Sequence, residues 1–90
     1  MLLIAKVNLG GSYFAAGRYE EAEVLMREAY VLAGSLQERA QQGVAIGHLG
    51  LIALQRGELG VALDHLEAAV QVADEEGDLW NAQHFARDLA

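Results

Sequence analysis

The sequence predicts an all-α protein in which antiparallel helix pairs stack into a short solenoid. Two observations lead to this fold class. The 90 residues contain no proline, and 53% of them are hydrophobic, with alanine and leucine prominent among them. The sequence also repeats itself weakly at an interval of forty residues, and periods of about 20–50 residues are typical of helical repeat arrays.

Small residues carry most of the forty-residue repeat. Gly10 is matched by Gly50, and Gly17 by Gly57. Further matched pairs are Ala5 with Ala45, Leu9 with Leu49, Ala22 with Ala62, Ala29 with Ala69 and Ala33 with Ala73. We expect Gly10 and Gly50 at crossings where two helix backbones come close. Gly17 and Gly57 are expected to end helices in the left-handed conformation, which glycine adopts without steric cost.

Five helices are expected, over residues 2–16, 19–35, 38–56, 59–75 and 79–90. The start of the third helix has two interpretations. The stretch Ser35-Leu36-Gln37-Glu38 matches a capping box that would start the helix at Leu36, whereas the repeat favours a start near residue 38. Asp78, directly after Gly77, is expected to cap the last helix. The chain then forms one domain with repeats at 1–36 and 37–76 and a final helix at 78–90, either a cap or a truncated third repeat.

The stretch NLGGSYFAAGRYEEAEVLMREAYVLA, from Asn8 to Ala33, resembles a tetratricopeptide repeat. The resemblance rests on Leu-Gly and an aromatic residue in the first helix, a glycine in the turn, and small residues in the second helix. The matching positions are Leu9, Gly10, Tyr13, Gly17, Ala22 and Ala29, and in the second copy Leu49, Gly50, Gly57, Ala62 and Ala69. The forty-residue period exceeds the usual 34 and is similar to the longer repeats of Leu-Gly-Asn-repeat proteins and kinesin light chains.

This resemblance implies a protein interaction module that binds a peptide or an amphipathic helix in a concave groove. Transferred position by position, the groove would be lined by Ile4, Val7, Asn8, Gly11, Phe14, Val44, Gly47, His48, Leu51, Leu54, Gln55, His84 and Arg87. Most of these residues are apolar, and the lysines of carboxylate-binding repeats are missing, so an apolar partner is favoured. Packing between neighbouring repeats is the alternative role of each aliphatic residue. We expect Phe14 and Leu54 to contact a partner.

The sequence contains no pattern typical of catalysis, a metal site or a cofactor. The three histidines, His48, His65 and His84, lack the spacing of helical zinc ligands, and no nucleophile or phosphate-loop motif is present. The formal net charge of −7 disfavours nucleic acid and anionic membranes as partners. With no cysteine and no apolar run long enough to span a bilayer, we expect a soluble, cytoplasmic, non-enzymatic protein without a cofactor.

Two other interpretations remain open at the sequence level. The chain could associate with a second copy of itself, through the open ends of the repeat or through the groove. It could also be an excised piece of a larger helical sensor or regulator.

Overall fold

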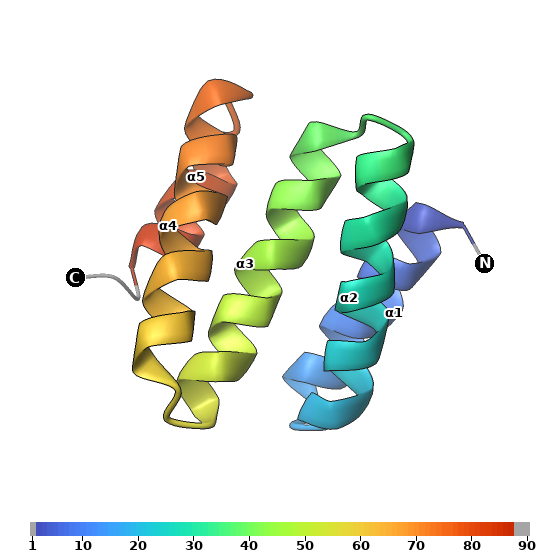
Figure 1. The fold of residues 1–90 in the computed structure, drawn as a ribbon, viewed down its shortest axis with the longest axis vertical. Helices are drawn as coiled ribbons and strands as arrows, with labels where there is room; N and C mark the ends of the chain where they lie inside the picture. Colours follow the sequence, from blue (N-terminus) through green and yellow to red (C-terminus); the bar gives the residue numbers. More distant parts are fainter. Residues whose placement is uncertain (1, 88–90) are drawn as a thin grey trace.

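The computed structural model describes residues 2–87. Within this range it contains five helices, which run alternately up and down (Figure 1). They are α1 (Leu3–Ala15), α2 (Tyr19–Ser35), α3 (Arg39–Gln55), α4 (Leu59–Glu75) and α5 (Leu79–Ala86). The all-α fold and the pairing of successive helices predicted from the sequence are confirmed.

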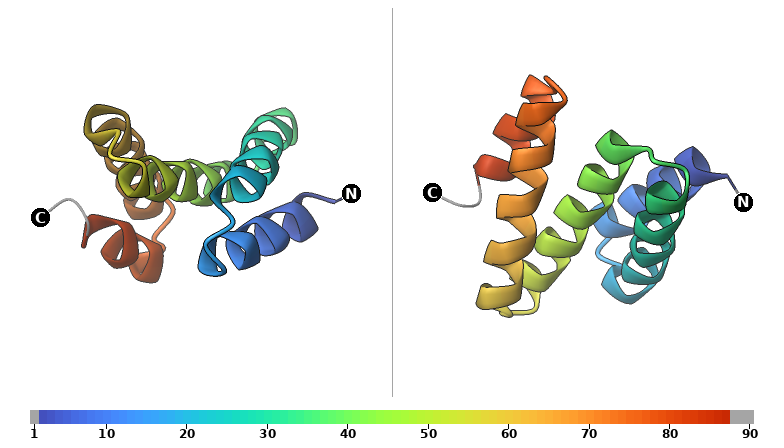
Figure 2. Two further views of the ribbon diagram at one scale, coloured as in Figure 1. Left: turned by 90° about the horizontal axis from the view of Figure 1, so that it is seen from below. Right: turned by 45° about the horizontal axis from the view of Figure 1, so that its top comes forward.

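We assign α1, α3 and α5 to an inner layer and α2 and α4 to an outer layer. In Figure 2 (left), α1 and α5 lie on one side of α3, and α2 and α4 lie on the other side. Each helix packs against its neighbours in the chain, and α1 also contacts α3. We call the surface of α1, α3 and α5 that faces away from α2 and α4 the inner face.

All four turns between helices have the same backbone geometry. In the first turn, the N–H of Arg18 donates to the carbonyl of Tyr13 at 2.8 Å, and the N–H of Gly17 donates to that of Phe14 at 3.0 Å. This pair of hydrogen bonds defines a Schellman motif, which requires a residue with positive φ. Glycine supplies it in three turns, at Gly17, Gly57 and Gly77, and Gln37 supplies it in the remaining one, with φ of 56°.

The left-handed Gln37 decides between the two expected starts of α3. A chain that is left-handed at residue 37 cannot be helical from Leu36 onward. Ser35 is instead the last residue of α2, and α3 begins at Arg39. Among the described residues, only Asp78 caps a helix with its side chain, accepting a hydrogen bond from the N–H of Asn81 at 3.1 Å. The last helix ends at Ala86, and the expected continuation through 88–90 lies outside the described residues.

The core is built where large side chains of one helix lie over glycines of the next. A Cβ added at Gly10 would lie 2.9 Å from Cε of Met26, and one at Gly50 would lie 2.9 Å from Cγ of Leu66. Alanines fill the rest of the second helices: Ala22, Ala29, Ala33, Ala62, Ala69 and Ala73 are all buried. The small residues of the repeat therefore let α1 approach α2, and α3 approach α4, more closely than two larger side chains would allow.

An ion pair network joins α2 to the end of α3. Glu23 accepts hydrogen bonds from Arg56 and from Arg27, each at 2.9 Å. The bond from Arg56, followed by that from Arg27, holds the pKa of the Glu23 carboxyl below its ordinary value. Arg27 lies one helical turn after Glu23, whereas Arg56 belongs to the turn between α3 and α4. The network therefore connects the two helix pairs at the surface.

Candidate functional site

A row of five rings runs from α1 and α2 across α3 to α5; four of the rings are half-buried, and that of Phe85 is buried in the core. The ring of Phe14 lies 5.5 Å from that of Tyr19 and 5.9 Å from that of His48. The ring of Phe85 in turn lies 5.9 Å from that of His48 and 5.2 Å from that of His84. The row passes from α1 and α2 over α3 to α5, and the contacts of His48 are edge-to-face, a favourable geometry for aromatic pairs.

His48 lies at the centre of this ring row. It is half-buried, and its Nδ1 donates a hydrogen bond to the carbonyl of Val44, one turn earlier in α3, at 3.0 Å. Burial lowers the pKa of the imidazole, the bond to Val44 opposes this shift, and the nearby His84 adds to it. The ring is therefore neutral at pH 7, with Nε2 as a hydrogen-bond acceptor. Gly11 of α1 faces Nε2, since a Cβ at that position would lie 3.9 Å from it, at ordinary van der Waals distance.

The residues expected in a groove differ in how accessible they are. Ile4, Asn8, Gln55 and Arg87 are exposed. Six others are half-buried: Gly11, Phe14, Val44, His48, Leu54 and His84. The remaining three, Val7, Gly47 and Leu51, are buried, so no partner can reach them in this conformation.

Packing between neighbouring helices accounts for the burial of these three residues. Val7 belongs to the core cluster with Leu3 and Met26. The ring of Phe85 covers Gly47 so closely that a Cβ there would lie 2.3 Å from Cζ. Leu51 packs in a second cluster with Phe85. For Val7, Gly47 and Leu51, the alternative role of packing between neighbouring helices agrees with their burial.

Sequence reasoning did not identify the ring row. Tyr19 and Phe85 were not among the expected groove residues, although both extend the row. The rings come from four helices, and no spacing along the chain shows that they meet. One signal was available in the glycines of the stretch GVAIGHLG: Gly43 lies under Val72, and Gly47 lies under Phe85. A glycine inside a helix indicates that a bulky neighbour crosses it.

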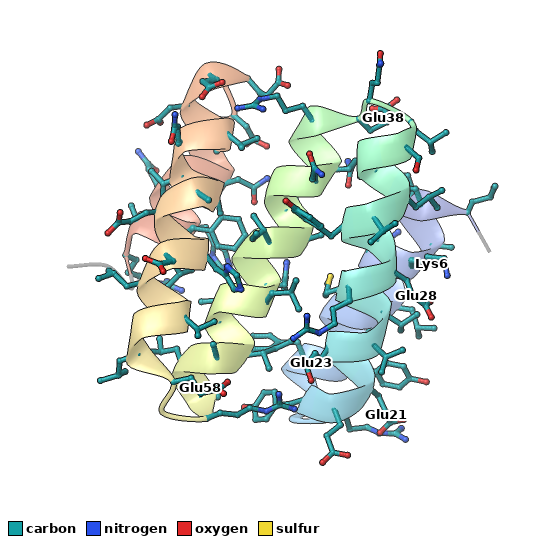
Figure 3. The ribbon with its side chains drawn as sticks, in the orientation of Figure 1. Lys6, Glu21, Glu23, Glu28, Glu38 and Glu58 are labelled. Atoms are coloured by element: carbon teal, nitrogen blue, oxygen red, sulfur yellow. The ribbon has the colours of Figure 1, made fainter. Side chains whose placement is uncertain are left out.

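Charge is divided between the two layers. Every acidic residue that the structure describes lies on α2, on α4 or in the turns, and none lies on α1, α3 or α5. Figure 3 labels five of the glutamates, all of them on α2 or at the ends of the hairpins. The described residues of α1, α3 and α5 therefore provide apolar side chains, amides, two imidazoles and the basic residues Lys6 and Arg39, but no acidic group.

Neither a metal-binding cluster nor a membrane-spanning helix is found among the described residues. No group of three or more histidines or carboxylates in residues 2–87 could hold a metal ion. In the same range, no helix has both the length and the apolar character needed to cross a membrane. The inner face presents half-buried rings and aliphatic groups around His48.

This fold, with its two layers and repeated turns, defines a helical repeat solenoid. A family model described as the tetratricopeptide repeat matches residues 1–75, more than half of the chain, and the chain therefore belongs to the tetratricopeptide repeat family. Proteins of this family generally mediate protein–protein interactions and are typically non-enzymatic scaffolds. No curated protein and no solved structure matches the sequence.

Proposed function

We propose that the chain is a protein interaction module whose inner face binds an apolar amphipathic helix or peptide. The observation that carries this proposal is the group of half-buried rings Phe14, His48 and His84, which lie on α1, α3 and α5, where the described residues include no acidic side chain. Aromatic rings provide large contact areas at low entropic cost, and binding energy concentrates on such residues.

The geometry favours a ligand with aliphatic or aromatic side chains and a neutral or weakly acidic polar face. Ile4 and the half-buried Phe14 and Leu54 offer apolar contact, while Asn8 and Gln55 offer amide hydrogen bonds. Nε2 of His48 can accept a hydrogen bond from a ligand N–H or O–H group. Arg87 is exposed at the α5 end of the face and gives that end a positive charge.

Selection from a displayed library of amphipathic helical peptides tests this proposal. We expect the enriched peptides to be rich in Leu, Phe or Trp and to lose about tenfold or more in affinity for Phe14→Asp. Asn8→Glu changes an exposed inner-face residue outside the core. It therefore tests the inner face even if Phe14→Asp does not fold. The matched control is Val24→Glu, because Val24 is 56% exposed on α2 in the outer layer.

The binding of the selected peptides to the three variants decides the proposal. Peptides that bind the wild type and Val24→Glu equally but fail on both inner-face variants would support the proposal. Peptides that bind Asn8→Glu as well as the wild type, or that lose affinity only for Val24→Glu, would place the binding surface elsewhere and overturn it.

The finer family assignment belongs to the same proposal. Equivalent helices begin forty residues apart, α2 at Tyr19 and α4 at Leu59, and α3 at Arg39 and α5 at Leu79. This interval supports a place in the longer-repeat subclass that resembles Leu-Gly-Asn-repeat proteins and kinesin light chains. The expected cytoplasmic location and the expected lack of enzymatic activity are also part of the proposal and rest on the sequence.

A further inference from the structure

His48 is a titratable side chain at the point where three helices meet. It belongs to α3, and its ring centroid lies 5.9 Å from that of Phe14 on α1 and 5.9 Å from that of Phe85 on α5. Histidine is the side chain whose charge ordinarily changes between about pH 5 and pH 8. A proton on His48 therefore places a charge among the rings and aliphatic groups of the inner face.

One nitrogen of this imidazole is accessible to water. Nδ1 donates to the carbonyl of Val44, whereas Nε2 has no hydrogen-bond partner in the part of the chain that the structure describes. No side-chain nitrogen or oxygen atom in residues 2–87 is both buried and without a hydrogen-bond partner. Nε2 must therefore touch the solvent, and it is the atom at which a proton from solution can bind.

The two helices that contact the ring of His48 from either side offer a positive charge no carboxylate. In the described residues, α1 and α5 contain no acidic side chain. Their charged and titratable groups are Lys6, Tyr13 and His84, with Arg87 directly after α5. Lys6 is paired with Glu28 of α2, and a positive charge on His84 repels one on His48.

The titratable groups of the other elements around α3 contact other residues or lie in turns. On α2 the ring of Tyr19 packs against Phe14, and on α4 the side chain of His65 lies beside Gly50. The carboxylate of Asp78 caps α5. Further groups are Glu76, which lines a small hollow with Val44 and Phe85, and the ion pairs Arg39–Glu75 and Arg56–Glu23. The other carboxylates of α2 and α4 are exposed in the outer layer. An imidazolium at His48 therefore depends mainly on water for its stabilisation.

A ligand on the inner face changes the cost of this protonation. Burial already holds the pKa of His48 below its ordinary value, with the bond to Val44 opposing this shift and His84 adding to it. An apolar ligand that covers Nε2 removes more water, and the charged imidazole loses more by this than the neutral one. The complex then binds fewer protons than the free chain below the ordinary pKa of histidine. By linkage, the affinity falls as the pH falls.

From these observations we propose that His48 makes ligand binding by the inner face depend on pH. The face holds an apolar helix or peptide while the imidazole is neutral and releases it when the imidazole is protonated. This inference rests on the proposed function, because it concerns the same face and the same class of ligand. The counterpart of His48 in α1 is Asn8, which does not titrate, so the response arises at the centre of the face.

The first test is the affinity for a peptide as a function of pH. The probe is a peptide selected for binding to the inner face and remade with Gln in place of every Asp, Glu and His, so that its own charge stays constant. By fluorescence anisotropy, we expect the affinity to fall about threefold or more from about pH 7.5 to about pH 5. Circular dichroism at each pH verifies that the chain is folded.

The three histidines supply the variants. His48→Gln should remove most of the pH dependence, whatever its affinity at neutral pH. His84→Gln should move the fall in affinity to higher pH, because it removes the repulsion that acts on His48. The matched control is His65→Gln, which removes a half-buried imidazole from α4 in the outer layer and should leave the pH dependence unchanged.

Nuclear magnetic resonance of the imidazole C–H groups gives a second measurement. The titration midpoint of His48 should move to lower pH when the chain is saturated with the peptide, and that of His65 should stay in place. The two measurements together separate an effect on His48 from a general effect of pH on the chain.

The outcomes also separate this inference from the proposed function. A chain that binds no selected peptide at neutral pH contradicts the proposed function itself. Binding of equal strength at both pH values, or a pH dependence that survives His48→Gln, contradicts only the role of His48. An affinity that rises toward low pH would mean that the neighbouring rings stabilise the imidazolium, and it would overturn the inference as well.

Discussion

The helices α1 and α3 are equivalent in the repeat, yet the structure uses their residues differently. Leu49 is 9% exposed in α3, whereas its counterpart Leu9 is 37% exposed in α1. The difference arises because α3 has helices on both sides, while α1 has neighbours on one side only. A repeat pattern therefore specifies which residues can be buried, and the position in the stack decides which of them are.

The largest expected effect comes from truncating the two equivalent leucines. Leu49→Ala should lower the free energy of unfolding by about 2–4 kcal/mol, because it leaves a cavity between α2 and α3. Leu9→Ala should lower it by about 1 kcal/mol or less, because that side chain is already partly in water. Urea denaturation at low micromolar concentration measures both without a contribution from association. Equal losses of unfolding free energy for Leu49→Ala and Leu9→Ala would contradict the difference in burial between α3 and α1.

The two crossing glycines should also respond unequally to alanine. A Cβ at Gly50 would meet Cγ of Leu66 and Cβ of His65, which are held close to their backbone. A Cβ at Gly10 would chiefly meet the flexible end of Met26. We expect Gly50→Ala to cost about 1–2 kcal/mol through overpacking. For Gly10→Ala, the gain in helix propensity of about 1 kcal/mol should offset the adjustment of Met26.

A matched control for these variants is Gly60→Ala, since no atom outside its own helix lies within 4 Å of a Cβ at Gly60. It should raise stability by about 0.5–1 kcal/mol. Thermal denaturation of the three variants gives their order, and a Gly50→Ala chain as stable as Gly60→Ala would contradict a close crossing of α3 and α4.

The turns between the helix pairs offer a smaller contrast. Gln37 and Gly77 occupy equivalent turns, and both have positive φ. A side chain in this conformation is strained, so Gln37→Gly should stabilise the protein by about 0.5–1 kcal/mol. For the same reason, Gly77→Ala should lower the free energy of unfolding by a similar amount. A loss of stability in Gln37→Gly would mean that the glutamine side chain makes a compensating contact.

The smallest expected effect is a dependence of stability on pH at His48, whose counterpart in α1 is Asn8. Because burial lowers the pKa of His48 in the folded chain, the unfolded chain binds more protons between that lowered value and the ordinary value near 6.5. Stability should therefore fall as the pH drops through this window and level off below it. Urea denaturation between about pH 5 and pH 8 measures the slope, and His48→Gln should reduce it.

Sequence reasoning predicted the helix bounds closely, because glycine, which ends three of the helices, favours the left-handed conformation of a helix end through its own local geometry. The bounds of α2 and α4 agree with the prediction, and α1 and α3 differ by one residue at each end. Gln37 was harder to anticipate, since a glutamine carries no sign of left-handed geometry. The inner face was predicted only in part. The accessibility of Val7, Gly47 and Leu51 depends on side chains from other helices. The hydrophobic periodicity of a single helix does not show which side chains of other helices cover it.

The regular turns and the contacts between chain neighbours also have a consequence for how the protein folds. Most contacts join residues that are close in sequence, and chains of this topology fold rapidly. Either helix pair can form first and serve as a template for the other. Amide hydrogens should then exchange most slowly in α3, which belongs to every partly folded form that spans both pairs, and fastest toward α1 and α5. The two ends of the stack would open and close many times before the centre does so once.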